Sequence, residues 1–291
     1  MVAASGGQGS EQLRRVMAAD VARQGLPEGP AAAGLVSEAD LAGLPAPVRR
    51  YPRYMGVAGR LADWSFQAHF AGRFRLRPGQ RWNPCHSWQY NCGLQVARVF
   101  HIRLAMGGVV PVLARDAYLR GRGSMRGALL GLLPVADASG PELDVSELVT
   151  YLSDAIIFAP SMLLALPVTW QADDDRSFGV TLEDAGHQVS AQVFLDEDGA
   201  PAGFSTEERY AAVPGRLVRT RWSTPGGGWR PVGGRPLPAR GQAIWHLPDG
   251  PFCYADLAFG PGDLTWNLPP GALTCPAGAP RPGTRERAGT T

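Results

Sequence analysis

The chain has 291 residues, of which 45% are apolar and 19% are charged, and its formal net charge is only +2. This composition is that of a globular protein long enough to bury a large core, and so small a charge argues against a nucleic-acid partner held by phosphate neutralisation. All 28 basic residues are arginine, which excludes mechanisms that need a lysine, such as Schiff bases and P-loops.

The N-terminus does not combine a basic segment with an apolar one, and no window reaches eighteen uninterrupted apolar residues. We therefore expect no signal peptide and no membrane span, and a cytoplasmic location. In that compartment the four cysteines are expected to be free thiols.

The first part of the chain predicts a helical arm. Residues 1–9 are small and polar and are expected to be disordered, whereas Ser10–Gln24 has one apolar side and predicts a helix. After a Pro/Gly/Ala linker, Ser37 and Asp40 have the spacing of a second helix start, and a further helical turn follows. We assign residues 1–40 to an N-terminal arm and linker.

Strict alternation of apolar and polar residues begins after this arm. Trp64, Phe66, Ala68, Phe70 and Phe74 form one row of a long strand, and arginines mark its wet face. Further alternating runs, separated by turn residues, continue almost to the C-terminus, and they predict about ten antiparallel strands.

One apolar helix interrupts the strands. Asp144 with Glu147 three residues later has the spacing of a capping box, and an apolar stripe follows over residues 145–158 until Pro160 stops the helix. Such a stripe must be buried, so the helix should lie across the sheet.

We therefore predict an α+β fold in which a strongly curved antiparallel β-meander, a half-barrel of about ten strands, wraps around a central amphipathic helix. Residues 41–268 would form this single domain, and residues 269–291 a disordered tail. Space that the helix leaves in the concave face would be a pocket lined by aromatic residues.

Several short runs resemble a family of uncharacterised bacterial proteins, over roughly residues 41–258. The runs are Leu44-Pro45-x-Pro47-Val48-x-Arg50-Tyr51, Trp82-x-Pro84 with Gln89, Leu129-Leu130-Gly131-Leu132-Leu133-Pro134-Val135, Gly140-Pro141-Glu142-Leu143-Asp144, Asp196-Glu197-Asp198-Gly199 and Trp245-His246-Leu247-Pro248-Asp249-Gly250-Pro251-Phe252.

This resemblance brings no established activity. Many members begin with a membrane-embedded segment, and we expect none in this chain. The chain also departs from those members at Pro52 and at Cys85-His86-Ser87. Asp154 stands where members usually carry a glutamate, so an acidic group on the central helix is retained. The order of strands and helix is also similar to the curved half-barrels of bacterial lipoprotein carriers, which shelter an acyl chain.

No motif for a known chemistry is present: G-x-S-x-G, H-E-x-x-H, C-x-x-C and a complete dinucleotide fingerprint are all missing. Cys85, His86 and Cys92 could offer zinc ligands, but their spacing matches no established pattern. We expect no metal and no cofactor.

Two residues are candidates for acid–base catalysis. His246 lies on a strand within a family motif. Asp116 shares a strand row with apolar residues and should face inward, where Arg126 on the next strand could pair with it. For both residues a purely structural role is the alternative.

Two functions remain open. The first is binding of an apolar small molecule or acyl chain in the cleft between sheet and helix; the second is an enzyme, a cyclase, isomerase or hydrolase of specialised metabolism, that uses the same cleft. A structural or stress-related interaction protein is a third reading. The predicted ligand-binding residues are Trp64, Phe66, Trp88, Tyr90, Tyr118, Arg126, Tyr151, Asp154 and Trp170.

Overall fold

A computed structural model describes residues 3–32, 34–130, 132–213, 216–260 and 262–274. One antiparallel sheet of fifteen strands dominates it, and a separate pair of short strands lies beside the sheet. The helices are α1 (Ala3–Ala22), α2 (Glu38–Ala42), α3 (Ala46–Tyr54) and α4 (Pro141–Phe158), with 3-10 helices η1 (Pro160–Ala165) and η2 (Pro270–Thr274).

The strands are β1 (Ser65–Phe74), β2 (Asn83–Cys92), β3 (Ala97–Met106), β4 (Val110–Leu119), β5 (Arg122–Leu129), β6 (Leu133–Ser139), β7 (Val168–Asp174), β8 (Ser177–Asp184), β9 (His187–Leu195), β10 (Pro201–Val213), β11 (Arg216–Ser223), β12 (Gly226–Gly227), β13 (Arg230–Val232), β14 (Arg235–Leu237), β15 (Arg240–Leu247), β16 (Gly250–Ala258) and β17 (Leu264–Trp266).

The sheet consists of two meanders joined at one seam. Strands β1 to β6 follow one another in space as they do in sequence, and so do β7 to β11, with β15 and β16 after them. The seam is the pair β1 and β16, where Ala71 lies opposite Ala258. Strands β6 and β7 are therefore the two outer edges, and in the described residues they do not pair with each other.

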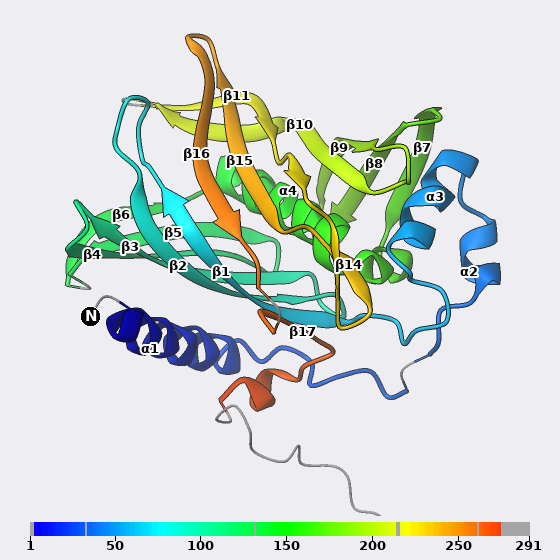
Figure 1. Ribbon diagram of the computed structural model, residues 1–291, viewed down its shortest axis with the longest axis horizontal. Coiled ribbons are helices and arrows are strands. Elements are labelled where there is room, and N and C mark those ends of the chain that lie inside the picture. Colours follow the sequence, from blue (N-terminus) through cyan, green and yellow to red (C-terminus); the bar gives the residue numbers. More distant parts are fainter. Residues whose placement is uncertain (1–2, 33, 131, 214–215, 261, 275–291) are drawn as a thin grey trace, which may run out of the picture.

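Helix α4 connects these two edges through the inside of the curled sheet, as Figure 1 shows. It packs against β3 to β6 on one side and against β9 and β10 on the other. Its residues are buried nearly all round, including the polar side chains of Asp144, Ser146, Glu147 and Ser153. The predicted position of the helix inside the curved sheet is confirmed, but it is enclosed rather than amphipathic.

The predicted start of α4 was wrong. The helix begins at Pro141, whose missing N–H costs nothing in the first turn, and Gly140 precedes it. Asp144 lies inside the helix, and its carboxylate accepts a hydrogen bond from the N–H of Gly123 in β5 at 2.7 Å. Asp144, which the sequence predicted to cap the helix, therefore joins the helix to the sheet instead.

The concave face holds the main hydrophobic core. Phe66 and Phe70 of β1 each contact Phe158 at the end of α4, with ring centroids 5.7 Å apart. Near the start of α4, the Tyr118 hydroxyl donates to Asp184 at 2.7 Å. There the β4–β5 and β8–β9 turns touch, so the two halves of the sheet meet through side chains without closing into a barrel.

A second, smaller core lies on the convex face, beneath α1 (Figure 1). Met17 and Val21 of α1 pack there with Tyr90, Val99 and Leu273. Asp20 of α1 also binds His101 at 2.9 Å and Arg115 at 2.6 Å.

Three expectations about the ends of the chain and the strands need correction. The first helix begins at Ala3, so residues 3–9 are helical rather than disordered, because the helix continues along the convex face. The predicted tail overlaps η2, whose Leu273 is buried, while residues 275–291 lie outside the described residues. The sheet has fifteen strands rather than about ten, because β6 contains a proline and β12 and β17 are too short to show a period. The domain boundaries stay predictions.

Candidate functional site

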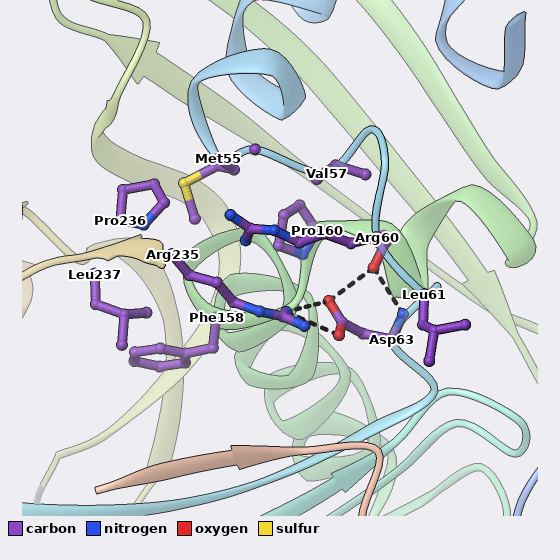
Figure 2. Close-up of a pocket in the computed structure, with 12 residues that line it drawn as sticks. Met55, Val57, Arg60, Leu61, Asp63, Phe158, Pro160, Arg235, Pro236 and Leu237 are labelled. Atoms are coloured by element: carbon purple, nitrogen blue, oxygen red, sulfur yellow. Dashed lines mark hydrogen bonds and ion pairs between the residues drawn. The ribbon is translucent and has the colours of Figure 1, made fainter. Parts of the chain in front are cut away.

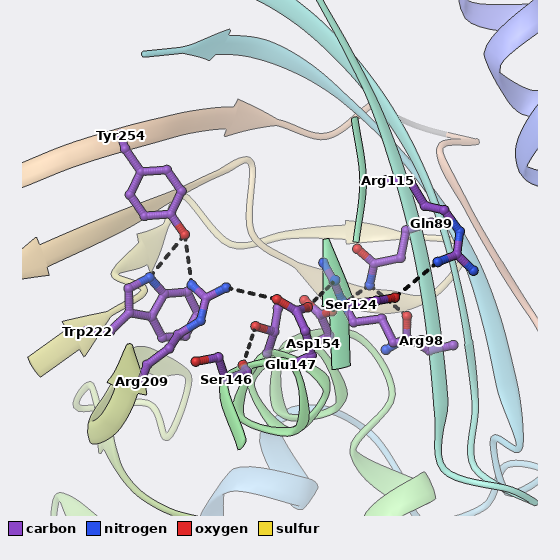
Figure 3. A network of polar contacts seen from close by, with 12 residues as sticks. Gln89, Arg98, Arg115, Ser124, Ser146, Glu147, Asp154, Arg209, Trp222 and Tyr254 are labelled. Atoms are coloured by element: carbon purple, nitrogen blue, oxygen red, sulfur yellow. Dashed lines mark hydrogen bonds and ion pairs between the residues drawn. The ribbon is translucent and has the colours of Figure 1, made fainter. Parts of the chain in front are cut away.

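Five ionisable side chains meet inside the curled sheet, and we call them the interior ion cluster. They are Arg98 of β3, Asp116 of β4, Glu147 and Asp154 of α4, and Arg209 of β10. Figure 3 shows most of them around α4, with Arg98 and Arg209 approaching the helix from opposite parts of the sheet. Burying so many charges is costly unless they are paired, so their pairing determines what the site can do.

Arg98 forms the fully paired half of the cluster. Its Nε donates to Asp154 at 2.7 Å and its Nη1 to Glu147 at 3.1 Å. Gln89 of β2 also donates to Asp154, at 2.7 Å. Burial nonetheless raises the pKa of Asp154, although the neighbouring Arg98 works against this increase.

Arg209 forms the half that is incompletely paired. Its Nη1 donates to the Tyr254 hydroxyl at 2.9 Å, and its guanidinium lies over the ring of Trp222, 4.3 Å from the centroid. Its Nη2 is 3.7 Å from Oε1 of Glu147, which is an ion pair but too long for a hydrogen bond. Within the described residues, Glu147 Oε1 and Arg209 Nε are buried without a hydrogen-bond partner.

Asp116 lies next to these groups, on the inner face of β4. It is opposite Phe100 of β3 and Met125 of β5. Burial, together with the negative charge of Glu147, raises the pKa of Asp116 to about 7. The site therefore resists a third negative charge.

Beyond the cluster, the concave face is not fully covered. Phe74, Val112, Ala114, Trp245 and Tyr254 pack against the main core but stay half-buried. We call these five residues the half-buried inner row. They offer apolar and aromatic surface beside the charged cluster.

A separate pocket lies at the other end of α4, with an empty volume of about 300 Å³ that includes space open to solvent. Figure 2 shows Asp63 facing Arg235 there, joined by contacts of 2.8 and 2.9 Å. Ser161 donates a further hydrogen bond to Asp63 at 2.7 Å. The other residues that line the pocket are Met55, Gly56, Val57, Arg60, Leu61, Phe158, Pro160, Pro236 and Leu237. The sequence gives no sign of this pocket, because most of its walls come from short segments without periodicity.

Four of the predicted ligand-binding residues lie inside the sheet. Phe66, Tyr118 and Tyr151 are fully buried. Both tyrosine hydroxyls donate hydrogen bonds within the protein, that of Tyr118 to Asp184 and that of Tyr151 to the carbonyl of Cys92 at 3.1 Å. Asp154 belongs to the interior ion cluster. Their roles in binding stay predictions, and their positions show three of them as packed core.

Trp88 and Tyr90 lie elsewhere than expected. They are on the convex face of β2, in the core beneath α1, because they alternate with the inward-facing Gln89. Trp88 donates to Ser10 of α1 at 3.1 Å. Trp64 packs against Gly29 of the linker.

Trp170 and Arg126 are also outside the cluster. Trp170 is half-buried on the edge strand β7, against Phe178. The predicted partnership of Arg126 with Asp116 was wrong: Arg126 is opposite Arg115 in register, on the other face of the sheet, and it contacts the exposed Asp137 at 3.4 Å.

The two candidate catalytic residues are not brought together. His246 follows the inward-facing Trp245, so it lies on the outer face of β15, where it contacts Ser223 at 2.8 Å. Burial lowers the pKa of His246, and the neighbouring Arg221 adds to this effect. Because Asp116 is on the inner face, the pair cannot act on one substrate. Cys85 and Cys92 are likewise on opposite faces of β2, so they cannot share a metal ion.

Among the helices of the described residues, we find none that is long and apolar enough to cross a membrane. Comparison with curated proteins gave no match. Among solved structures, the chain is similar to a LolA superfamily protein from Nitrosomonas europaea, with 13% sequence identity and a TM-score of 0.38 over 79% of this chain and 93% of the other. A model of the family of unknown function DUF6544 matches residues 34–257, most of the chain and nearly the whole sheet, and the protein therefore belongs to this family.

Proposed function

We propose that the protein binds an apolar small molecule or an acyl chain on the concave face of the sheet, along the half-buried inner row. The observation that carries this proposal is the partial exposure of Phe74, Val112, Ala114, Trp245 and Tyr254, which are continuous with a fully buried core. Covering such a surface with an apolar guest removes it from water, which is favourable by about 25 cal/mol per Å².

Helix α4 fills the middle of the curled sheet, and residues such as Leu148 and Leu152 are completely buried. A guest would therefore lie beside the helix, against the inner row, rather than replace it. The alternative function, an enzyme, is not supported by its two proposed catalytic residues, because Asp116 and His246 lie on opposite faces of the sheet.

A pair of neighbouring substitutions tests the proposal. Ala114→Phe fills the inner row with a large ring, whereas Leu113→Phe adds a ring at the next residue, on the opposite face of the same strand. We expect the uncharged apolar dye Nile red to bind the wild-type protein, and Ala114→Phe to weaken its binding at least about tenfold, a loss of about 1.4 kcal/mol. Leu113→Phe should bind within about twofold of the wild type.

Native mass spectrometry of the purified protein provides an independent measurement, because a co-purified lipid or other hydrophobic molecule would appear as added mass. A protein that carries no guest and does not bind Nile red would overturn the proposal. Equal weakening by both variants would also count against it, because a ring on the outer face would then interfere with binding as much as a ring on the inner row.

A further inference from the structure

The interior ion cluster contains a donor and an acceptor that nothing in the described residues satisfies. Arg209 Nε is a donor and Glu147 Oε1 is an acceptor, and the two side chains are 8% and 1% exposed. A buried polar atom without a hydrogen-bond partner is destabilising, so such atoms call for a partner. Nη2 of Arg209 lies 3.7 Å from Oε1 of Glu147, so a small group that entered between the two side chains would meet both of them.

The charges around these atoms are already balanced. Arg98 and Arg209 supply two positive charges, and Glu147 and Asp154 supply two negative charges. A ligand that brought a carboxylate or an ammonium group would add an uncompensated charge in a region of low dielectric. The pKa of Asp116, which burial and Glu147 raise to about 7, shows the same resistance to further negative charge.

We propose that the molecule bound on the inner row is an uncharged amphiphile whose hydroxyl or amide head donates to Glu147 Oε1 and accepts from Arg209 Nε. This inference rests on the proposed binding function and adds the chemical class of the ligand. A hydroxyl or amide group is both a donor and an acceptor, which a carboxylate and an ammonium group are not.

The surroundings of Arg209 fit a molecule with one polar end. The guanidinium lies over Trp222 and Trp245, and Tyr254 binds it from the inner row. Figure 3 shows Tyr254 and Trp222 on the side of Arg209 away from α4. The polar head would thus lie at the cluster while the apolar chain extends over Trp245 and Tyr254.

Three probes of equal chain length test the head group: lauryl alcohol, lauramide and laurate, each competing with Nile red at mildly alkaline pH. We expect the alcohol and the amide to bind the wild-type protein at least about tenfold more tightly than laurate. Equal binding of all three would overturn this inference, and it would leave the proposed binding function intact. Failure of every probe to bind would overturn the proposed function itself.

Glu147→Gln provides a charge-switch test, because it removes one negative charge and keeps the shape of the side chain. This variant should bind laurate at least about tenfold more tightly than the wild type does and should lose the preference for the alcohol. Glu207→Gln, at an exposed position outside the cluster, should behave as the wild type. An unchanged preference in Glu147→Gln would overturn the inference.

Circular dichroism and thermal unfolding establish whether the variant folds. If Glu147→Gln does not fold, Asp154→Asn removes a negative charge from the other side of the cluster. It should shift the preference toward laurate in the same direction, and the absence of that shift would overturn the inference.

Discussion

Ionising Asp116 would place a third carboxylate among Glu147, Asp154 and two arginines. Its pKa rises from 3.8 to about 7, so between these pH values the folded protein holds a proton that the unfolded chain has lost. The free energy of unfolding should therefore fall as the pH rises from about 4 to about 7. The slope from one such group is at most about 1.4 kcal/mol per pH unit.

Asp116→Asn should remove this part of the pH dependence, because an asparagine stays uncharged across the range. Urea denaturation at a series of pH values measures the difference between variant and wild type. Asp137→Asn, at an exposed position, should keep the wild-type dependence. If Asp116→Asn shows the same slope as the wild type, the raised pKa is refuted.

For Asp116, the sequence predicted correctly that the side chain faces the inside of the sheet, but it predicted the wrong ion-pair partner. Alternation along a strand fixes which face a side chain takes, but the register with the next strand decides which residue lies opposite. A one-residue difference in register puts Met125, rather than Arg126, beside Asp116. Arg209 was missed because a bulge in β10 interrupts the alternation just before it.

The close contact between α4 and β5 depends on Gly123 of β5, which has no side chain. A Cβ atom at Gly123 would lie 2.0 Å from the carbonyl oxygen of Leu143 and 2.7 Å from the backbone nitrogen of Asp144. Gly123 also donates its N–H to the Asp144 carboxylate. The first turn of the helix can therefore approach the strand this closely only at a glycine.

Gly123→Ala should lower the free energy of unfolding by about 3 kcal/mol or more, because helix and strand must move apart. Gly227→Ala in β12 is the matched control, since a Cβ there would meet no atom within 4 Å. Urea denaturation measures both variants. Equal stability of the two would show that the close approach is not needed.

Long elements could be predicted and short ones could not. The alternation in β1 and the apolar run of α4 each extend over at least ten residues, and both were found. The start of α4 was misplaced because an aspartate followed by a glutamate has the same spacing whether it caps a helix or binds a neighbouring strand. The pocket that Asp63 lines is formed mostly by short segments that carry no period, such as β14 and η1, with Phe158 at the end of α4.

The whole molecule has three layers at α1: this helix, the sheet and α4. Asp20 ties the outer layer to the sheet through His101 and Arg115, and it is only 6% exposed. Removing one partner of a buried ion pair is costly because the remaining charges stay buried.

Asp20→Asn should therefore lower the free energy of unfolding by about 3 kcal/mol. Glu38→Gln removes a carboxylate from an exposed ion pair with Arg53 and should cost less than about 1 kcal/mol. Thermal and urea denaturation compare the two variants. A loss in Asp20→Asn no larger than that in Glu38→Gln would show that the ion pairs contribute little to docking α1.

The curved sheet around a helix could be predicted from the whole sequence, but the second core could not. The rows of β2 showed that Trp88 and Tyr90 share a face, yet nothing in their spacing indicated that α1 would cover it. A prediction from alternation finds two faces and cannot decide which of them receives a second layer.

The seam between β1 and β16 has a consequence for how the chain folds. On either side of this seam, neighbouring strands are consecutive in the sequence and can pair as local hairpins, except that β15 follows β11 after a short insertion. At the seam, by contrast, Ala71 and Ala258 come from opposite ends of the sheet-forming segment. Contacts between such distant segments form slowly, because a long loop has to close first. The two meanders should thus collapse early around the central helix, and their junction should set the folding rate.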